Sequence, residues 1–436
     1  MRGLALSALL FVACSGGPPS ATVTASATPS QAPTVAVSAA PSIPSPPSEP
    51  VGGPLPRTFT RLTFDNGTHE GTMTSDKRLQ LGASPAIGSY VDPYGRTISD
   101  ERGIWTSAAV RTPFAFDRLI ASWNATTPAG TWIDVQMRAS GASRQTKFYT
   151  LAIWSSGDDT VHRTTVRGQS DGDGRVNVDT FEAGTGAAEL TSFELRLTLH
   201  RAAGVAATPS VALLTAATSR VALPSVPSTF SGVVRDLDVP MLSQEAHTGH
   251  YPEYDGGGEA WCSPTSTAMV LGFWKSGPSD GDLSTFPGAS HADGQVDHAA
   301  RFTYDWSYEG AGNWPFNTAY AAQYGLEGFV TRLRSLAEAE RFIAAGIPLI
   351  ASINGVLPGF LFTSTNGHLL VIRGFDAKGD VITNDPAVRG NSQARKVYPR
   401  RDFESVWLLG STGTVYVIHP VGVALPPNVA GLPANW

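Results

Sequence analysis

The sequence predicts two folded regions of different class, an all-β sandwich domain followed by an α+β domain. From Thr58 to Ala222, apolar and polar residues alternate and no long helical pattern appears, which is typical of half-buried strands. After a Pro-containing joint at 223–232, helical and strand-like patterns follow one another. The chain has 436 residues, 42% of them hydrophobic, so it is long enough for two or three domains with their own cores.

Residues 1–14 have the organisation of a lipoprotein-type bacterial signal peptide. Arg2 supplies a positive start, and Leu4–Val12 form an apolar core that is too short to span a bilayer. The segment FVAC (11–14) resembles a lipoprotein cleavage box, in which Cys14 becomes the lipidated first residue. An ordinary secretory signal cut near Ala13 is the alternative. We expect an extracytoplasmic protein, either lipid-anchored to the cell membrane or secreted.

The composition changes sharply after the signal. Between residues 15 and 56 no aromatic residue occurs and Glu49 is the sole charge, so this stretch cannot bury a core. We therefore expect a disordered Ser/Thr/Pro/Ala linker at 15–57, a β-sandwich accessory domain at 58–222, the α+β domain at 235–420 and a C-terminal tail at 421–436.

Alternation supports the β-sandwich most clearly at Phe193–Leu199 and at Ile133–Met137, where every second residue is apolar. Several aromatic residues of this region are interpreted as core or edge packing, because aromatic side chains carry much of the burial in β-domains. A sugar-binding face, and with it glycan binding, is the alternative. These aromatic residues are Trp105, Trp123, Trp132, Tyr149 and Trp154.

Within 256–274, a Gly run leads into a predicted helix that starts near Cys262 and continues to Trp274, discussed below. Ser335 and Glu338 form a capping-box pattern before a helix that stops at Gly346. A buried strand is predicted at 348–353, and a hairpin at 369–375 and 380–385.

Cys262 is the candidate nucleophile. It is the sole cysteine outside the export signal, and it lies in GGGEAWCSPTSTAMVLGFW (256–274). Pro264 suits a first helical turn, so Cys262 is predicted at the start of a helix, where the helix dipole favours a thiolate. A buried, inert apolar side chain is the alternative.

His368 is the candidate base, because it precedes a strand that returns to a carboxylate in NGHLLVIRGFDAKGDVITNDPA (366–387). With a turn centred between residues 377 and 378, His368 faces residue 387, and Asp385 is its diagonal neighbour on the same face. Asn384 is a second candidate on the opposite face. A hydrogen-bonded core histidine is the alternative for His368.

Together, VPMLSQ (239–244), AWCSPTSTAMVL (260–271), NGHLLVIRGFD (366–376) and VITNDPA (381–387) resemble the bacteriocin-processing (double-glycine) peptidase family and its papain-like relatives. The resemblance implies a papain-like fold for 235–420, with Cys262 as nucleophile, His368 as base, Asp385 as its orienting group and Gln244 as oxyanion donor. Gln244 lies farther from Cys262 than is usual in that family, so HTGHYPEYDGGGE (247–259) is interpreted as an insertion.

The expected function is that of a cysteine peptidase, a thiol hydrolase that cleaves peptide or isopeptide bonds of a peptide or protein substrate through an acyl-enzyme. A catalytically degenerate papain-like binding protein and an acyltransferase are the alternatives. The formal net charge is −6 and no basic run occurs, so nucleic acid is not an expected partner.

No cofactor and no metal are expected. Two groups of potential metal ligands occur, His247 and His250 with Glu253 or Asp255, and His291 with Asp293 and His298. They lack the helical motif of metalloproteases and lie in Gly- and Pro-rich stretches, so we interpret them as solvated loops.

Overall fold

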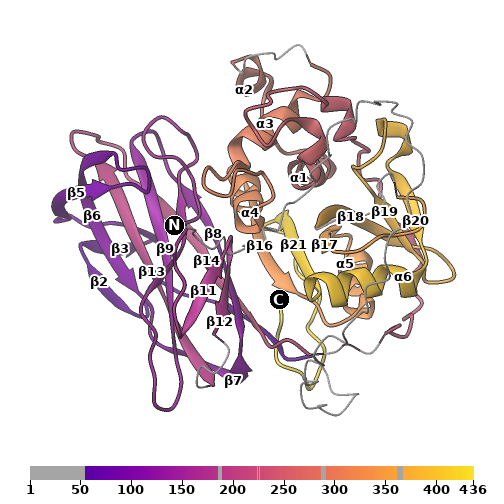
Figure 1. The fold of residues 1–436 in the computed structure, drawn as a ribbon, viewed down its shortest axis with the longest axis horizontal. Helices are drawn as coiled ribbons and strands as arrows, with labels where there is room; N and C mark the ends of the chain where they lie inside the picture. Colours follow the sequence, from indigo (N-terminus) through magenta and orange to yellow (C-terminus); the bar gives the residue numbers. More distant parts are fainter. Residues whose placement is uncertain (1–54, 185–188, 223, 225, 286–290, 361–366) are drawn as a thin grey trace, which may run out of the picture.

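The computed structural model describes residues 55–436 except 185–188, 223, 225, 286–290 and 361–366 (Figure 1). The expected signal peptide with Cys14, and nearly all of the expected linker, lie outside these described residues. Within the described part of the chain, no helix is both long enough and apolar enough to cross a membrane.

The N-terminal region consists of strands arranged in two seven-stranded sheets whose strand pairs are antiparallel. The first sheet contains β1 (Arg57–Arg61), β3 (Thr72–Ser75), β4 (Arg78–Leu81), β8 (Arg118–Thr126), β11 (Gly174–Asn177), β12 (Thr180–Ala183) and β14 (Ser210–Ser219). The second contains β2 (Thr68–Glu70), β5 (Ala86–Val91), β6 (Thr97–Thr106), β7 (Val110–Phe116), β9 (Thr131–Ser140), β10 (Tyr149–Trp154) and β13 (Leu190–Ala202). Inward side chains of both sheets belong to one hydrophobic cluster, which agrees with the strand-only region that the sequence predicts.

Side-chain alternation explains how these sheets bury their core. On β13, Phe193, Leu195, Leu197 and Leu199 are all buried, because alternate residues of a strand point to the same face. The five aromatic residues considered for a sugar-binding face are buried as well, with exposed fractions of 0–1% for Trp105, Trp123, Trp132, Tyr149 and Trp154. They therefore pack in the interior, as the favoured interpretation predicted, and do not form an exposed face.

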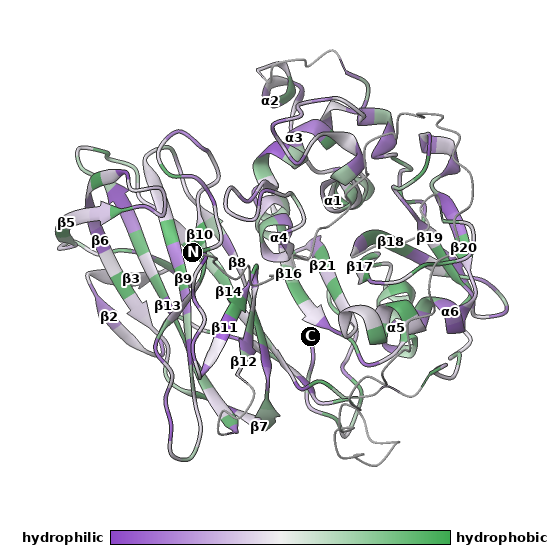
Figure 2. Ribbon diagram, in the orientation of Figure 1, coloured by the Kyte–Doolittle hydropathy of each residue, from purple (hydrophilic) through white to green (hydrophobic). Residues whose placement is uncertain are grey.

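The C-terminal region combines a third seven-stranded sheet with helices. The sheet order is β16-β21-β17-β18-β19-β20, with β15 paired to β18. Its strands are β15 (Arg235–Asp236), β16 (Leu326–Arg332), β17 (Leu349–Ile353), β18 (His368–Phe375), β19 (Val381–Asn384), β20 (Arg395–Tyr398) and β21 (Thr414–Pro420). Figure 2 shows apolar residues along the central strands, and every residue of β17 and β18 is buried.

The helices of this region lie around the sheet (Figure 1). The α-helices are α1 (Cys262–Phe273), α2 (Asp280–Ser284), α3 (Gly294–Thr303), α4 (Trp314–Ala322), α5 (Leu336–Ala344) and α6 (Arg400–Glu404). Shorter helical turns are η1 (Glu245–His247), η2 (Gly258–Ala260), η3 (Asn391–Gln393) and the π-helical η4 (Ser405–Leu409). The N-terminal region is thus all strand, and the C-terminal region is a mixed sheet-and-helix domain.

The predicted elements around 335–385 are present, with one correction. Ser335 is the N-cap of α5, but its side chain makes no capping hydrogen bond. The expected capping box is wrong because Glu338 turns to Arg334 instead, accepting from its backbone N–H at 2.7 Å and from its guanidinium at 3.0 Å. Both side chains are buried, so the ion pair takes the place of the cap.

The two regions meet at a buried junction between β8 and β16. The Asn124 side chain donates to the Gly328 carbonyl at 2.8 Å and accepts from the Gly328 N–H at 3.2 Å. Trp123 packs its ring edge against Phe316 of α4, with ring centroids 6.1 Å apart. Hydrogen bonds and aromatic packing therefore join the strand region to the mixed region.

The segment expected as a tail also packs against the folded protein. Trp436 is 7% exposed and its ring lies 5.1 Å from that of Phe342. The buried Asn435 side chain donates to the Arg332 carbonyl at 3.0 Å and to Glu338 at 2.8 Å. This end of the chain thus contributes to the interior beside β16 and α5.

Candidate active site

Cys262 is the first residue of α1, and it is fully buried. The preceding turn η2 and the N-cap Trp261 lead the chain into the helix, and the Trp261 indole donates to the Tyr254 carbonyl at 2.7 Å. Backbone N–H groups at a helix start have no partner inside the helix and carry partial positive charge. The thiol therefore lies where a negative charge on sulfur is favoured.

His368 begins β18, directly opposite Ile353 of β17. The β18–β19 pairing starts as Phe375 opposite Val381 and ends as Val371 opposite Asn384, with a register shift beside Arg373. This bulge displaces the pairing by one residue. Beyond it the register is the one that the sequence predicts, so Asp385 comes within reach of His368.

Asp385 accepts a hydrogen bond from His368 Nε2 at 2.8 Å. Its carboxylate also accepts from the Tyr398 hydroxyl of β20 at 2.7 Å and from the Ala387 N–H at 3.0 Å. His368 and Asp385 are 2% and 1% exposed. The buried carboxylate thus accepts from three donors, which hold it in place. Because His368 uses Nε2 for this bond, its Nδ1 is not bonded to Asp385.

The Cys262 side chain hydrogen-bonds His368. Burial by itself would lower the pKa of the imidazole, but the charge and hydrogen bond of Asp385, together with Cys262, raise that pKa to about 10. A histidine that stays protonated beside a cysteine favours an ion pair of imidazolium and thiolate. The structure therefore brings together three of the four predicted site residues, Cys262, His368 and Asp385.

Gln244 lies next to these residues but faces differently. Its buried side-chain amide donates to the Glu259 carbonyl, and to Glu245 at 3.3 Å, while its backbone N–H donates to the Pro386 carbonyl at 3.0 Å. Both amide hydrogens are therefore engaged. These bonds fix Gln244 to the segment that leads to Cys262 and to the segment that follows Asp385. Gln244 therefore lies at the site, but neither of its amide hydrogens is directed at a substrate.

Asn384, the second candidate for orienting the histidine, has another function. Its side chain donates to the carbonyls of Val239 and Pro240 at 3.0 and 2.9 Å, and it accepts from Arg373 at 3.0 Å. These bonds tie the start of the mixed region to the β18–β19 pair. Asn384 therefore holds the sheet together on the face opposite His368.

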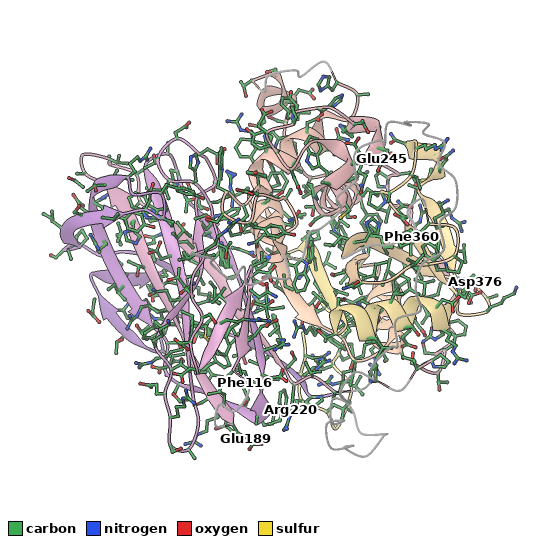
Figure 3. The ribbon with its side chains drawn as sticks, in the orientation of Figure 1. Phe116, Glu189, Arg220, Glu245, Phe360 and Asp376 are labelled. Atoms are coloured by element: carbon green, nitrogen blue, oxygen red, sulfur yellow. The ribbon has the colours of Figure 1, made fainter. Side chains whose placement is uncertain are left out.

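Three further residues of the site were not predicted. Tyr398 completes the bonding of Asp385. Phe360, labelled in Figure 3, meets the His368 ring edge-on with centroids 5.3 Å apart, so it covers the imidazole. Asp255 is close enough to Cys262 that the thiol, after burial, helps to raise the pKa of this carboxyl to about 8. Only strand pairing or loop conformation brings these residues near, so no sequence motif marks them.

A cavity of about 240 Å³ lies at the junction of the two regions, beside the start of β18. Gly367 and Leu369, the chain neighbours of His368, line it, as do the aromatic residues Tyr308 and Trp314. The N-terminal region supplies part of the wall. Its charged lining residues are Arg118, Asp179 and Glu182, which face Arg332 of the mixed region.

Two family models match the chain. Residues 236–414 match the Peptidase_C39 like family, and residues 57–219 match the Peptidase C39 N-terminal domain. A cysteine at a helix start, paired with a histidine on a neighbouring strand, is the arrangement of a thiol-dependent enzyme. The chain belongs to the C39 family of papain-like cysteine peptidases, as the sequence resemblance predicted.

Comparisons with individual proteins add little to the family match. No curated protein matches the chain. Among solved structures, the chain resembles the xylan-binding module CBM15 at 14% identity, over 38% of this chain and 99% of that module, with a TM-score of 0.21. It also resembles the kappa-carrageenase from Pseudoalteromonas carrageenovora, in complex with an oligotetrasaccharide, at 11% identity over 39% and 99%, with a TM-score of 0.19. Likenesses this distant carry no argument about function.

Proposed function

We propose that this protein is an extracytoplasmic cysteine peptidase that cleaves peptide or isopeptide bonds through an acyl-enzyme. The observation that supports the proposal is the buried chain of hydrogen bonds from Cys262 through His368 to Asp385, at the start of α1. A buried ion pair of this kind costs desolvation energy, so its presence in a binding module would be unexplained. In a peptidase it supplies a nucleophile at neutral pH.

The reaction would proceed in two halves. The Cys262 sulfur forms a bond to the substrate carbonyl carbon, and when the tetrahedral intermediate collapses, the C–N bond breaks and His368 gives its proton to the leaving amine. Water then attacks the thioester and gives one proton to His368, and breakage of the C–S bond releases the acid product. Asp385, held by Tyr398, orients the imidazole and stabilises its positive charge in both halves.

The oxyanion would be stabilised at the start of α1. The Cys262 backbone N–H belongs to the positive helix end, which suits a developing negative charge. Gln244 is the second proposed donor. For this it must exchange its 3.3 Å contact with Glu245 for the substrate oxygen, while its bond to the Glu259 carbonyl keeps the amide in place.

The junction cavity is the proposed binding cleft for the substrate chain. Gly367 and Leu369, which precede and follow His368 in the chain, line it, and so do residues of both regions of the protein. Arginine and carboxylate side chains occur together there with Tyr308 and Trp314, so it offers a substrate both charged and aromatic contacts. This composition supports a polar peptide as substrate, with the N-terminal region taking part in its recognition. We infer a papain-like fold for the mixed region from its family and from the packing of α1 on β18.

The proposed location is outside the cytoplasm. A lipid on Cys14, followed by the predicted linker, would hold the folded regions away from the membrane surface. This part of the proposal rests on the sequence pattern alone.

The test is covalent labelling with a peptide aldehyde or an activated ester, read by intact mass. We expect one adduct per chain in the wild type and none in Cys262→Ser. Cys14→Ser is the matched control, since Cys14 is the only other cysteine in the chain, and it should keep the adduct. A wild type that forms no adduct although its circular dichroism is native would support the degenerate binding protein instead. An added amine that captures the acyl group faster than water does would identify an acyltransferase.

A further inference from the structure

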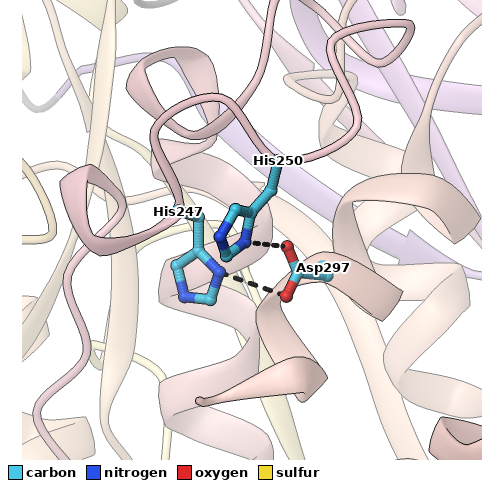
Figure 4. Close-up of side chains that lie close together, drawn as sticks. All are labelled: His247, His250 and Asp297. Atoms are coloured by element: carbon cyan, nitrogen blue, oxygen red, sulfur yellow. Dashed lines mark hydrogen bonds and ion pairs between the residues drawn. The ribbon is translucent and has the colours of Figure 1, made fainter. Parts of the chain in front are cut away.

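Three histidines and one aspartate meet beside α3, away from the Cys262–His368 pair. His247 is the last residue of η1, His250 follows in the next turn, His291 comes shortly before α3, and Asp297 lies in α3 itself. Figure 4 shows the rings of His247 and His250 directed at the Asp297 carboxylate. The sequence suggested two separate solvated loops here, but the fold joins them, and it buries His247 and Asp297.

The spacing of the ligand atoms suits a small metal ion. His247 Nδ1 and His291 Nδ1 lie 3.2 and 3.8 Å from Asp297 Oδ2, and His250 Nδ1 lies 3.0 Å from Oδ1. One ligand atom from each of His247, His250 and Asp297 falls within 4.8 Å of the others. In a tetrahedral site with bonds of about 2.0–2.1 Å, ligand atoms stand roughly 3.3 Å apart.

Hydrogen bonding within the described residues does not account for this cluster. No hydrogen bond of good geometry reaches either ring nitrogen of His247, Nδ1 of His291 or Oδ2 of Asp297, although all are buried atoms. His247 is 1% exposed, and its Nδ1 has only the ionic contact with Asp297. Buried polar atoms without partners are costly and rare. One bound cation would satisfy a ring nitrogen of His247, Nδ1 of His291 and Oδ2 of Asp297 together.

We propose that His247, His250, His291 and Asp297 bind one zinc ion. Imidazole nitrogen and carboxylate oxygen are ligands that zinc accepts, and four protein ligands make a closed site of the structural kind. Nothing in the proposed peptidase mechanism uses this ion. The site goes beyond that mechanism, and it does not depend on it.

The ion would tie the 247–259 insertion to α3. This insertion starts just after Gln244 and ends just before Cys262, and the His247 ring centroid lies 6.2 Å from that of Trp261, the residue that precedes α1. Fixing the first residues of the insertion to α3, with His247 beside Trp261, would help to position both Gln244 and the helix start. The inserted loop, which departs from the family pattern, would thus hold the active-site residues in position.

The experiment measures zinc on the full-length protein in the Cys262→Ser background, where the candidate catalytic thiol cannot bind metal. The chelator-stripped protein is reloaded with zinc and desalted, and its metal is quantified by mass spectrometry and by competition with a chromophoric chelator. We expect one zinc per chain. His247→Ala and Asp297→Asn should each weaken binding at least tenfold, whereas His419→Ala, a buried histidine outside the cluster, should not.

A second variant and a second probe keep the test decisive. If His247→Ala does not fold, His250→Ala replaces it, because His250 is 23% exposed in its side chain and is the more tolerant position. Cobalt in place of zinc should give the intense visible bands of a tetrahedral site, and these should be lost in Asp297→Asn. The proposal is overturned if the protein retains no zinc, or if the zinc content and affinity of the cluster variants equal those of the parent protein. The cluster would then be a metal-free set of His–Asp contacts.

Discussion

Replacing Asp255 by asparagine should stabilise the protein, and increasingly so as the pH rises. Burial, and after it the nearby Cys262, raise the pKa of the Asp255 carboxyl from 3.8 to about 8, against the opposing effect of the Ala311 backbone N–H. The folded protein therefore keeps this carboxyl protonated at neutral pH. Asparagine has nearly the same shape, keeps an acceptor for the Ala311 N–H and has no charge to bury.

The sign follows from the protons bound by each state. Between pH 3.8 and about 8 the folded protein holds a proton on Asp255 that the unfolded chain has lost, so the free energy of unfolding falls as the pH rises. Each pKa unit corresponds to about 1.36 kcal/mol. From about pH 5 to pH 8 the wild type should therefore lose up to about 4 kcal/mol relative to Asp255→Asn, which has no such titration.

The assay is denaturant unfolding of both proteins at several pH values across this range, followed by tryptophan fluorescence and circular dichroism. The measured quantity is the difference in unfolding free energy between variant and wild type. Asp159→Asn is the matched control, because Asp159 is exposed and its replacement should leave that difference flat. A flat difference for Asp255→Asn as well would refute the argument that this carboxyl is buried as a neutral acid. In the Cys262→Ser background the difference should level off at a lower pH and reach a smaller total, since Cys262 contributes to the raised pKa of Asp255.

Three further outcomes are expected. Iodoacetamide should alkylate Cys262 rapidly at about pH 6, and His368→Ala should slow this while the fold survives; equal rates by mass spectrometry would exclude the ion pair. Tyr398→Phe removes a hydrogen bond to the buried Asp385 carboxylate, which should cost about 1.5 kcal/mol, or roughly tenfold in kcat/KM, and an unchanged kcat/KM would show that Tyr398 is dispensable. Cys14→Ser should release the protein from membranes or block its processing, and a wild type found wholly soluble with Ala13 removed would contradict lipidation.

Local sequence patterns were enough to predict the scaffold of the candidate site. Pro264 in a first turn places Cys262 at the start of α1, and the apolar run after His368 becomes the fully buried β18. The predicted register survives because of a feature that the sequence did not reveal. The turn alone displaces the pairing by one residue, and the bulge beside Arg373 restores it. Gly374 is required there, because a Cβ would clash with the Arg235 carbonyl of β15.

Contacts between distant segments could not be predicted in this way. Tyr398 reaches Asp385 only because β20 pairs with β19. The capping box at Ser335 failed for a related reason, since Glu338 accepts from both the backbone N–H and the guanidinium of the buried Arg334, and the charged pair is stronger than a bond to the Ser335 N–H alone. Such choices depend on burial and on charge partners far along the chain, which sequence spacing does not record.

The junction between β8 and β16 has a consequence for dissection of the protein. Asn124 satisfies both backbone polar groups of Gly328, and the Ser122 hydroxyl accepts the Val330 N–H at 2.9 Å. A fragment starting near residue 235 would leave this edge of the sheet without partners and expose the ring of Phe316 to water. An unpaired strand beside an exposed apolar side chain is a template for aggregation. Loss of activity in such a fragment would therefore be explained by the exposed edge of the sheet. It would not by itself show that the strand domain takes part in substrate recognition.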